Sequence, residues 1–344
     1  MRALQLTDSL EEPLAIVEVP MPTLQSLAPR QAIVRIKAAA LNHRDVWISQ
    51  RMYPHIRPFC TLGSDGCGVV EQVSSPEDSS LIGKTVVINP NQHWGPKKEV
   101  QSAQYSILGN PVDGTFAEYI AIDVHRLCEK PPHLTVAQAA ALPIAGLTAY
   151  RVICKCSGLD SSHQVLITGI GGGVALFALQ FALVFKAGVW VTSSSPEKIW
   201  HAKQLGAREG FNYRQADWHK QALEATGGFD FIIDGTGGED FNKLIEIIKP
   251  GGKIITYGAT AGAPRQVHLP RIFYKQITIQ GSTMGNDEEF AQMLQFCTQH
   301  HIVPVIDSVR PFSKIISAFE EMRQGKQFGK LVVSMENGSS NETS

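Results

Sequence analysis

The sequence lacks an excess of charge of either sign. Its 344 residues include 31 Lys and Arg against 32 Asp and Glu, which gives a formal net charge of −1. A protein that binds nucleic acid or an anionic membrane surface needs a surplus of basic residues to neutralise phosphates. The charge balance therefore argues against both partners. With 43% hydrophobic residues, the chain is typical of a globular protein long enough for two domains.

Long hydrophobic runs are also missing. The longest nearly apolar stretch, residues 174–185, is interrupted by Gln180 and is shorter than the roughly 20 residues that cross a bilayer. The first residues alternate as in a strand and contain neither the apolar core nor the cleavage site of a secretory signal. We therefore expect a cytoplasmic protein that does not span a membrane.

Cysteine is scarce, and its spacing is irregular. The six cysteines do not form the array of a disulfide framework, and this pattern is typical of a reducing compartment. Between Cys67 and Cys128 there is no cysteine at all. This gap excludes a cluster of thiolate ligands in that stretch.

The pattern of the chain changes near residue 128. Before that point, short alternating runs separated by Gly, Pro, Asn and Asp predict a partly open β-barrel. After it, apolar strands alternate with helical segments, which predicts a doubly wound parallel sheet of the α/β class. Two folds of different type are therefore expected in one chain.

A glycine-rich turn follows the first of the later strands and opens a helix. In this context the glycines permit close approach of a pyrophosphate to the backbone, and the helix N-terminus offers unpaired N–H groups. A purely structural turn is the alternative, but the strand and helix units that follow complete a nucleotide-binding fold. The predicted cofactor-binding residues of this turn are Gly169, Gly171, Gly172, Gly173 and Val174.

The end of the second strand indicates which nucleotide is bound. An NAD site usually places an acidic residue there for the ribose 2′-hydroxyl, and none is present. Instead, Ser194, Ser195 and Lys198 offer hydroxyls and an ammonium for a 2′-phosphate, and Tyr213 follows the next strand. Lys198 on a solvated helix face and Ser195 as a simple N-cap are the alternatives, and both are compatible with phosphate binding. We predict NADP(H) as the cofactor.

The order of motifs resembles that of the medium-chain dehydrogenase/reductase superfamily, which contains zinc alcohol dehydrogenases and zinc-free quinone oxidoreductases. The matching runs include VRIKAAALNHRDVW, GSDGCGVVEQV, GTFAEYIAI, AALPIAGLTAY, IKPGGKIITYGA and FGKLVV, and they cover nearly the whole chain. The resemblance implies a GroES-like catalytic domain made of residues 1–128 and 284–344. It implies a Rossmann domain at residues 129–283 and an active site in the cleft between the two domains.

The residues at the family's zinc-ligand positions are unsuited to zinc. Where zinc-containing members have Cys, His and Cys, the matching positions are Asn42, Ser64 and Ile144. Zinc prefers thiolate, imidazole or carboxylate ligands. The gap between Cys67 and Cys128 also removes the four cysteines of the family's structural zinc. The resemblance therefore predicts no bound metal.

The segment Asn42-His43-Arg44-Asp45 matches the Asn-x-x-Asp pattern of the zinc-free quinone and enone reductases. Asn42 and Arg44 are suitable hydrogen-bond donors for an oxygen on which negative charge collects. Asp45 is interpreted as an orienter of neighbours such as Arg44, or as a buried helix cap. Asp65 either lies near the nicotinamide or caps a turn. Together these four are the candidate catalytic residues.

The resemblance adds further expectations. Thr148 matches a position that contacts the nicotinamide side, while Gly235 and Tyr257 follow strands whose ends border the cofactor. The strand at 276–282 resembles the family's edge strand that pairs across a homodimer. The segment 89–113 has no interpretation from sequence.

We therefore expect a zinc-independent NAD(P)H-dependent oxidoreductase that transfers hydride to a small-molecule quinone, enone or reactive carbonyl. An alcohol or aldehyde dehydrogenase that works without zinc is the second hypothesis. The third is a nucleotide-binding protein that has lost catalysis. Turnover of a substrate panel with NADPH or NADP separates the three.

Overall fold

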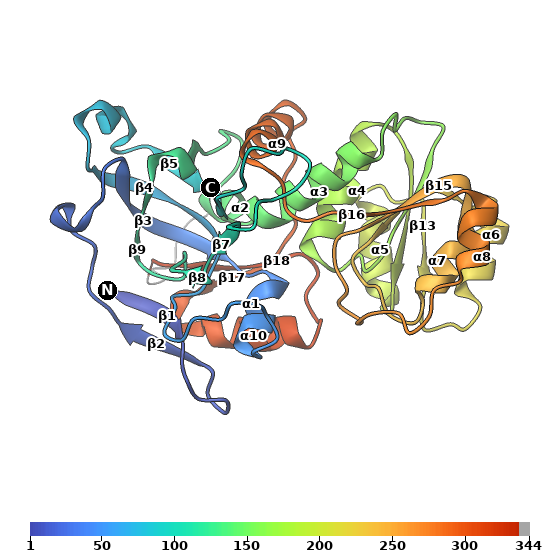
Figure 1. Cartoon of the computed structure of the whole chain (residues 1–344), viewed down its shortest axis with the longest axis horizontal. Helices are drawn as coiled ribbons and strands as arrows, with labels where there is room; N and C mark the ends of the chain where they lie inside the picture. Colours follow the sequence, from blue (N-terminus) through green and yellow to red (C-terminus); the bar gives the residue numbers. More distant parts are fainter. Residues whose placement is uncertain (337–344) are drawn as a thin grey trace. The chain divides into compact units, whose positions relative to one another are not determined.

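The chain divides into two compact units, which are seen in the computed structural model of residues 1–336 (Figure 1). The first unit contains Met1–Ile144 and Asn286–Ser344, and the second contains Ala145–Gly285. The first boundary lies later than the residue 128 expected from sequence. The reason is that helix α2 (Val136–Ala140) packs against strands of the first unit through alanines that are fully buried.

A seven-stranded sheet forms the centre of the first unit. Its strands follow the order β10-β5-β4-β3-β18-β17, and β9 also pairs with β3. Their bounds are β3 (Gln31–Ala40), β4 (Asp65–Val73), β5 (Thr85–Ile88), β9 (Tyr119–Asp123), β10 (Leu127–Glu129), β17 (Ile306–Pro311) and β18 (Lys330–Ser334). Aliphatic side chains from these strands pack with Phe116, Phe312 and Phe319 in one hydrophobic core. The predicted β-rich region before residue 128 is confirmed.

The end of the chain returns to the first unit and completes this sheet. Figure 1 shows β18, in red, beside β3, in blue, and the two strands pair antiparallel with Val332 opposite Ala40. On its other side β3 pairs antiparallel with β4, so that Ala40 lies opposite Asp65. The last residues of β3 and the first residues of β4 and β18 therefore meet at one end of the sheet.

The segment 89–113 contains a small three-stranded sheet. Its strands are β6 (Asn91–Gln92), β7 (Ser106–Leu108) and β8 (Pro111–Val112). The buried Trp94 ring meets Tyr105 edge-on at 5.1 Å, and its Nε1 donates to Lys97 O at 3.0 Å. Tyr105 in turn donates from its hydroxyl to Asn91 Oδ1 at 2.9 Å. An aromatic pair with polar contacts thus holds a segment that sequence analysis left uninterpreted.

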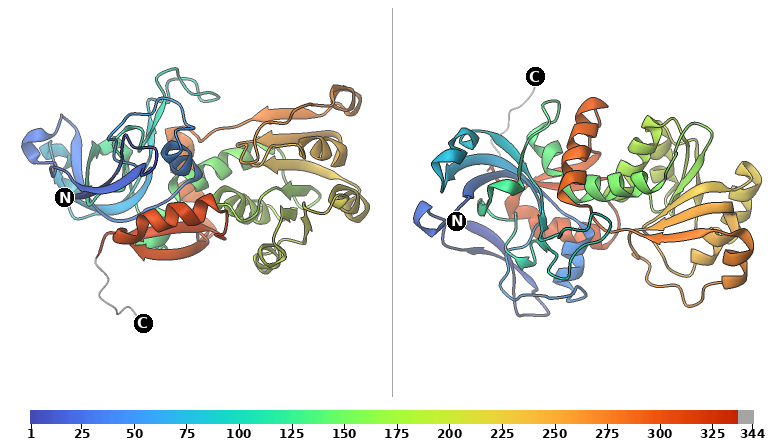
Figure 2. Two further views of the ribbon diagram at one scale, coloured as in Figure 1. Left: turned by 90° about the horizontal axis from the view of Figure 1, so that it is seen from below. Right: turned by 45° about the horizontal axis from the view of Figure 1, so that its top comes forward.

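The second unit is built on a six-stranded parallel sheet with the order β13-β12-β11-β14-β15-β16. This is the strand order of the dinucleotide-binding doubly wound fold, so the predicted fold class is confirmed. The bounds are β11 (Gln164–Ile167), β12 (Gly188–Ser193), β13 (Glu209–Asn212), β14 (Phe229–Asp234), β15 (Ile248–Thr256) and β16 (Thr278–Gly281). Figure 2 shows these strands running side by side with helices packed along them.

Helices of moderate length complete both units. They are α1 (His43–Ser49), α3 (Pro143–Lys155), α4 (Gly173–Val184), α5 (Pro196–Gln204), α6 (Trp218–Thr226), α7 (Phe241–Ile247), α8 (Leu269–Lys275), α9 (Asp287–Gln299) and α10 (Ile315–Arg323). The two remaining strands, β1 (Arg2–Leu6) and β2 (Leu14–Glu18), form an antiparallel pair. Within residues 1–336, every helix is too short or too polar to cross a bilayer.

Candidate functional site

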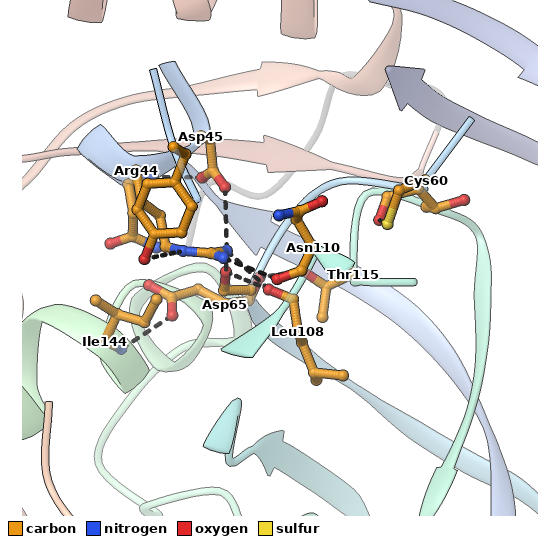
Figure 3. A network of polar contacts seen from close by, with 12 residues as sticks. Arg44, Asp45, Cys60, Asp65, Leu108, Asn110, Thr115 and Ile144 are labelled. Carbon is orange, nitrogen blue, oxygen red and sulfur yellow. Dashed lines mark hydrogen bonds and ion pairs between the residues drawn. The ribbon is translucent and has the colours of Figure 1, made fainter. Parts of the chain in front are cut away.

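Five charged or amide side chains gather where β3, β4 and β18 meet in the first unit. We call Asn42, Arg44, Asp45, Asp65 and Lys330 the polar cluster, and each is at most 8% exposed. The four candidate catalytic residues expected from sequence thus lie together, joined by one lysine that was not expected. Figure 3 shows the part of this cluster around Arg44 and Asp65.

Lys330 joins two strands and a helix through its ammonium. The Nζ atom donates to Asn42 Oδ1 at 2.7 Å and to Asp65 Oδ2 at 2.9 Å. The other oxygen of Asp65, Oδ1, accepts from the backbone N–H of Ile144 at 2.9 Å, at the start of α3 (Figure 3). Both carboxylate oxygens of Asp65 are therefore engaged by donors of the first unit.

Asp45 fixes the start of helix α1. Its Oδ2 accepts from the backbone N–H of Asn42 at 2.8 Å, so that Asp45 caps the N-terminus of the helix. Its Oδ1 lies 3.8 Å from Arg44 Nη1, which is an ion-pair distance. Burial raises the pKa of the Asp45 carboxyl to about 6, and the charge of Arg44 only partly opposes this rise. The cap and the neighbour contact offered by sequence as alternatives occur together.

Arg44 spends its donors on the protein. Nη1 donates to Ser64 Oγ at 2.6 Å and to Leu108 O at 2.8 Å, and Nη2 donates to Asn110 O at 3.2 Å. The guanidinium also lies 4.9 Å from the ring centre of Tyr53, within cation–π range. In this geometry Arg44 ties α1 to β4 and to the 89–113 segment, rather than pointing a donor at a substrate.

The donor set at the family's zinc positions does not fit zinc. Ser64 Oγ accepts from Arg44 and donates to Leu108 O at 2.7 Å, while Asn42 Oδ1 faces the Lys330 ammonium. Ile144 offers only an apolar side chain, which is no metal ligand. A cation would also meet the positive charge of Lys330 at this place. Elsewhere in residues 1–336, no three His, Cys, Asp or Glu side chains are grouped so that they would hold a metal ion.

The glycine-rich turn of the second unit fits a dinucleotide. Gly169 has φ +66°, which glycine adopts without strain, and it begins the turn between β11 and α4. At Gly172, the N-cap of α4, a side-chain Cβ would meet nothing nearer than 3.7 Å. The backbone from Gly171 to Val174 is half-buried and so keeps an accessible side. The turn thus offers an open cradle of backbone N–H groups at the start of a twelve-residue helix.

A buried aspartate connects this turn to the loop after β14. Asp234 Oδ1 accepts from Thr168 Oγ1 at 2.7 Å and from Thr236 Oγ1 at 2.8 Å, and its Oδ2 accepts from Gly237 N–H at 3.1 Å. The next residue, Gly235, lies against the hydroxyl of Tyr257, which leaves no room for a side chain. Asp234 therefore sets the geometry of both loops at the carboxyl ends of β11 and β14.

The carboxyl end of β12 presents hydroxyls. Ser193 lies opposite Asn212 in the pairing of β12 with β13, so the residues after both strands are neighbours. Ser195 caps α5 by accepting from the Lys198 backbone N–H at 3.3 Å, and Tyr213 is 40% exposed nearby. The first acidic residue after β12 is Glu197, whose side chain is 82% exposed. Ser194 and Lys198 are half-buried at this end of the sheet.

Thr148 is the remaining cofactor residue expected from sequence. It lies in α3, is 6% exposed, and its hydroxyl lies 3.8 Å from the sulfur of Met284. The second unit thus holds all twelve predicted cofactor residues, while the polar cluster belongs to the first unit.

Sequence reasoning missed Lys330 and the use of Ser64. Lys330 is 288 residues from Asn42 along the chain, and a single lysine before an apolar strand gives no local signal of burial. Its position in the FGKLVV run, quoted above only as a shared motif, was the one available hint.

Comparisons with known proteins identify the class. A family model described as "Alcohol dehydrogenase GroES-like domain" matches residues 28–132, and one described as "Zinc-binding dehydrogenase" matches residues 173–299. The chain is 35% identical to the zinc-type alcohol dehydrogenase-like protein YogA of Leptosphaeria maculans, over 93% of each protein. It is 27% identical to the human synaptic vesicle membrane protein VAT-1 homolog, over 89% of this chain and 79% of that protein.

Solved structures agree with this class. The crystal structure of an NAD-dependent alcohol dehydrogenase superposes with a TM-score of 0.89 at 33% identity, and covers 98% of this chain and 100% of that one. Fold and sequence together define an alcohol dehydrogenase-like oxidoreductase with a GroES-like unit and a Rossmann unit. The chain belongs to the medium-chain dehydrogenase/reductase superfamily, as its motifs suggested.

Proposed function

We propose that the protein is an NADPH-dependent, zinc-independent reductase that adds a hydride and a proton to a quinone, an enone or a reactive carbonyl. The observation that carries this proposal is the polar cluster. At the positions where zinc-containing relatives have metal ligands, this chain has Asn42 and Ser64 engaged by Lys330 and Arg44. Hydrogen-bond donors and buried cations therefore take the place of a Lewis acid at the substrate oxygen.

A nicotinamide cofactor, when bound, supplies the hydride. Its pyrophosphate is assigned to the backbone of Gly171, Gly172 and Gly173, where the cradle is open. Its 2′-phosphate is assigned to Ser194, Ser195 and Lys198, because the end of β12 offers hydroxyls and an ammonium instead of an acid. The solved relative is described as NAD-dependent, so nucleotide choice has to be measured for this chain.

An alcohol dehydrogenase is the second candidate, and the similarity to the solved alcohol dehydrogenase favours it. The two candidates are separated by one assay. Purified protein is mixed with NADPH and 1,4-naphthoquinone, an enone or an aldehyde, and separately with NADP and a primary alcohol, and the nicotinamide absorbance is followed. Faster turnover of the quinone or enone supports the proposal, whereas turnover of the alcohol alone rejects it.

Zinc independence has its own measurement. Metal analysis is carried out on protein that was purified without chelators, and activity is measured before and after dialysis against a strong chelator. Substoichiometric zinc and unchanged activity are expected. One zinc per chain together with loss of activity on chelation would contradict the proposal.

We further propose a homodimer that forms through strand β16. This strand pairs only with β15 among the described residues, and Ile279 on it is 37% exposed. Beside it in sequence, α8 carries Phe273 and Tyr274, which are 71% and 85% exposed. The six unpaired cysteines support a reducing compartment, and we propose the cytoplasm.

A further inference from the structure

The contact between Lys330 and Asn42 fixes which way the Asn42 amide points. A lysine ammonium has three donors and no acceptor. The Asn42 atom that lies 2.7 Å from Lys330 Nζ must therefore be the carbonyl oxygen, Oδ1. The amide nitrogen, Nδ2, is turned away from the lysine by the same contact.

This nitrogen is a buried donor without a hydrogen-bond partner among residues 1–336. The Asn42 residue as a whole is only 8% exposed. Leaving such a donor unpaired costs about 1–3 kcal/mol, and native structures keep unpaired buried groups chiefly where a function requires them. An acceptor that arrives with a ligand would satisfy it.

Asn42 is held from both sides. Its backbone N–H donates to Asp45 Oδ2 at 2.8 Å, and its side-chain oxygen is bound by Lys330. Asp65 compensates the charge of Lys330 at 2.9 Å and is itself oriented by the Ile144 N–H. The unpaired Nδ2 is therefore preorganised, because neither the amide nor the lysine is free to rotate.

The arrangement follows from strand register. With Val332 opposite Ala40 in the antiparallel β18–β3 pair, the start of β18 reaches the level of Asn42 just beyond β3. With Ala40 opposite Asp65, the start of β4 reaches the same end. Three segments distant in sequence thus deliver an ammonium, a carboxylate and an amide to one point.

We propose that Lys330 is a positioning residue of the reductase site, which holds the Asn42 amide so that Nδ2 donates to the acceptor oxygen of the substrate. This inference rests on the proposed function. Asn42 is then the group that touches the substrate, and it remains neutral while charge develops on that oxygen. Lys330 acts through Asn42 and does not itself touch the substrate.

A double-mutant cycle tests this pathway. Asn42→Ala is expected to lower kcat with 1,4-naphthoquinone and NADPH by about 10²–10³-fold, the effect typical of losing one oxyanion donor. Lys330→Met is expected to lower kcat by about tenfold or more in the native background, with a smaller effect on KM. In the Asn42→Ala background, Lys330→Met should have no further effect on kcat. Effects that multiply in the double variant would overturn the proposal.

The variants need controls for folding, because Lys330→Met leaves the buried Asp65 carboxylate unpaired. Lys330→Met with Asp65→Asn removes both charges and should fold more stably while keeping the low kcat. Lys37→Met is the matched control, since Lys37 pairs with Glu336 at 2.7 Å on the same sheet but outside the cluster. NADPH affinity, measured by fluorescence, should be unchanged in all variants.

A readout without turnover separates the two proposals. In protein labelled with [¹⁵N]asparagine, the Asn42 side-chain NH₂ signals are identified by their loss in Asn42→Ala. They should exchange slowly with water in the native protein and in Lys37→Met, and rapidly in Lys330→Met. Unchanged exchange in Lys330→Met would refute positioning. If exchange changes but no quinone, enone or aldehyde is reduced, the proposed function fails and the positioning of the amide stands.

Discussion

At the scale of residues, the polar cluster carries balanced charge in a buried place. Arg44 and Lys330 face Asp45 and Asp65, and each of the four is at most 7% exposed. Removing one member leaves an uncompensated buried charge, which is strongly destabilising. Substitutions that neutralise a single charge without changing shape are therefore the most informative probes of this cluster.

Asp45 should give stability a distinct pH dependence. Burial raises its pKa from 3.8 to about 6, so the folded protein holds this proton more tightly than the unfolded chain does. The contribution of Asp45 to the free energy of unfolding therefore falls as pH rises from about 4 to about 6, and is constant above that. Asp45→Asn lacks this titration. In urea unfolding, the native protein should lose stability relative to the variant over this interval, and a difference independent of pH would contradict the expectation.

Lys198 should contribute to nucleotide choice. If its ammonium contacts the 2′-phosphate, Lys198→Ala weakens NADPH binding by about tenfold, or ~1.4 kcal/mol, and leaves NADH binding nearly unchanged. Lys203→Ala is the control, because Lys203 lies on the same helix but pairs with Glu209 at 2.7 Å. Fluorescence titration with both nucleotides measures the effect. Equal weakening of NADPH and NADH would show that Lys198 does not contact the phosphate.

At the scale of elements, the 89–113 segment has a metal-free means of staying folded. The Trp94–Tyr105 contact takes the place of the cysteine-bound zinc that the family's structural site would provide. Asn89 and Arg126 also bind Asp287 at the start of α9, at 2.9 and 2.6 Å, which anchors the stretch on either side of the segment. The segment therefore depends on one buried indole.

Trp94→Ala should loosen this segment selectively. Truncating a buried tryptophan costs about 3–5 kcal/mol, and the loss here falls on a small three-stranded sheet. Hydrogen exchange in residues 89–113 should accelerate while β11 to β15 keep their protection. Trp200→Ala, at a 56% exposed position, is the control and should leave the segment unchanged. Equal protection of residues 89–113 in the native protein and in Trp94→Ala would contradict this role.

Local pattern was sufficient for some elements and insufficient for others. The parallel strands β11 to β15 are short apolar runs with helices between them, so their type and order were predictable from periodicity. The start of α2 inside the first unit was not, because its place depends on packing against β3 and β4. Lys330 was missed for the same physical reason: its partners, Asn42 and Asp65, become neighbours only through the register of three strands.

At the scale of the whole molecule, the open edge of β16 is the feature that most needs a partner. An exposed strand edge beside exposed aromatic side chains favours association, and natural proteins usually cover such edges. Pairing of β16 with a second copy would extend the parallel sheet of the second unit across an axis of symmetry. Leu269 on α8, which is 64% exposed, adds to the apolar surface that this pairing would bury.

A charge placed on this surface should therefore separate the copies. Tyr274→Glu puts a carboxylate where a symmetric contact would bring two together, and like charges at an interface are repulsive. Light scattering should give twice the mass of one chain for the native protein and the mass of one chain for the variant at the same concentration. Leu10→Glu, at a 79% exposed position in the first unit, should leave the dimer intact. A native protein that has the mass of one chain at micromolar concentration would refute the dimer, and a Tyr274→Glu variant that remains dimeric would place its interface elsewhere.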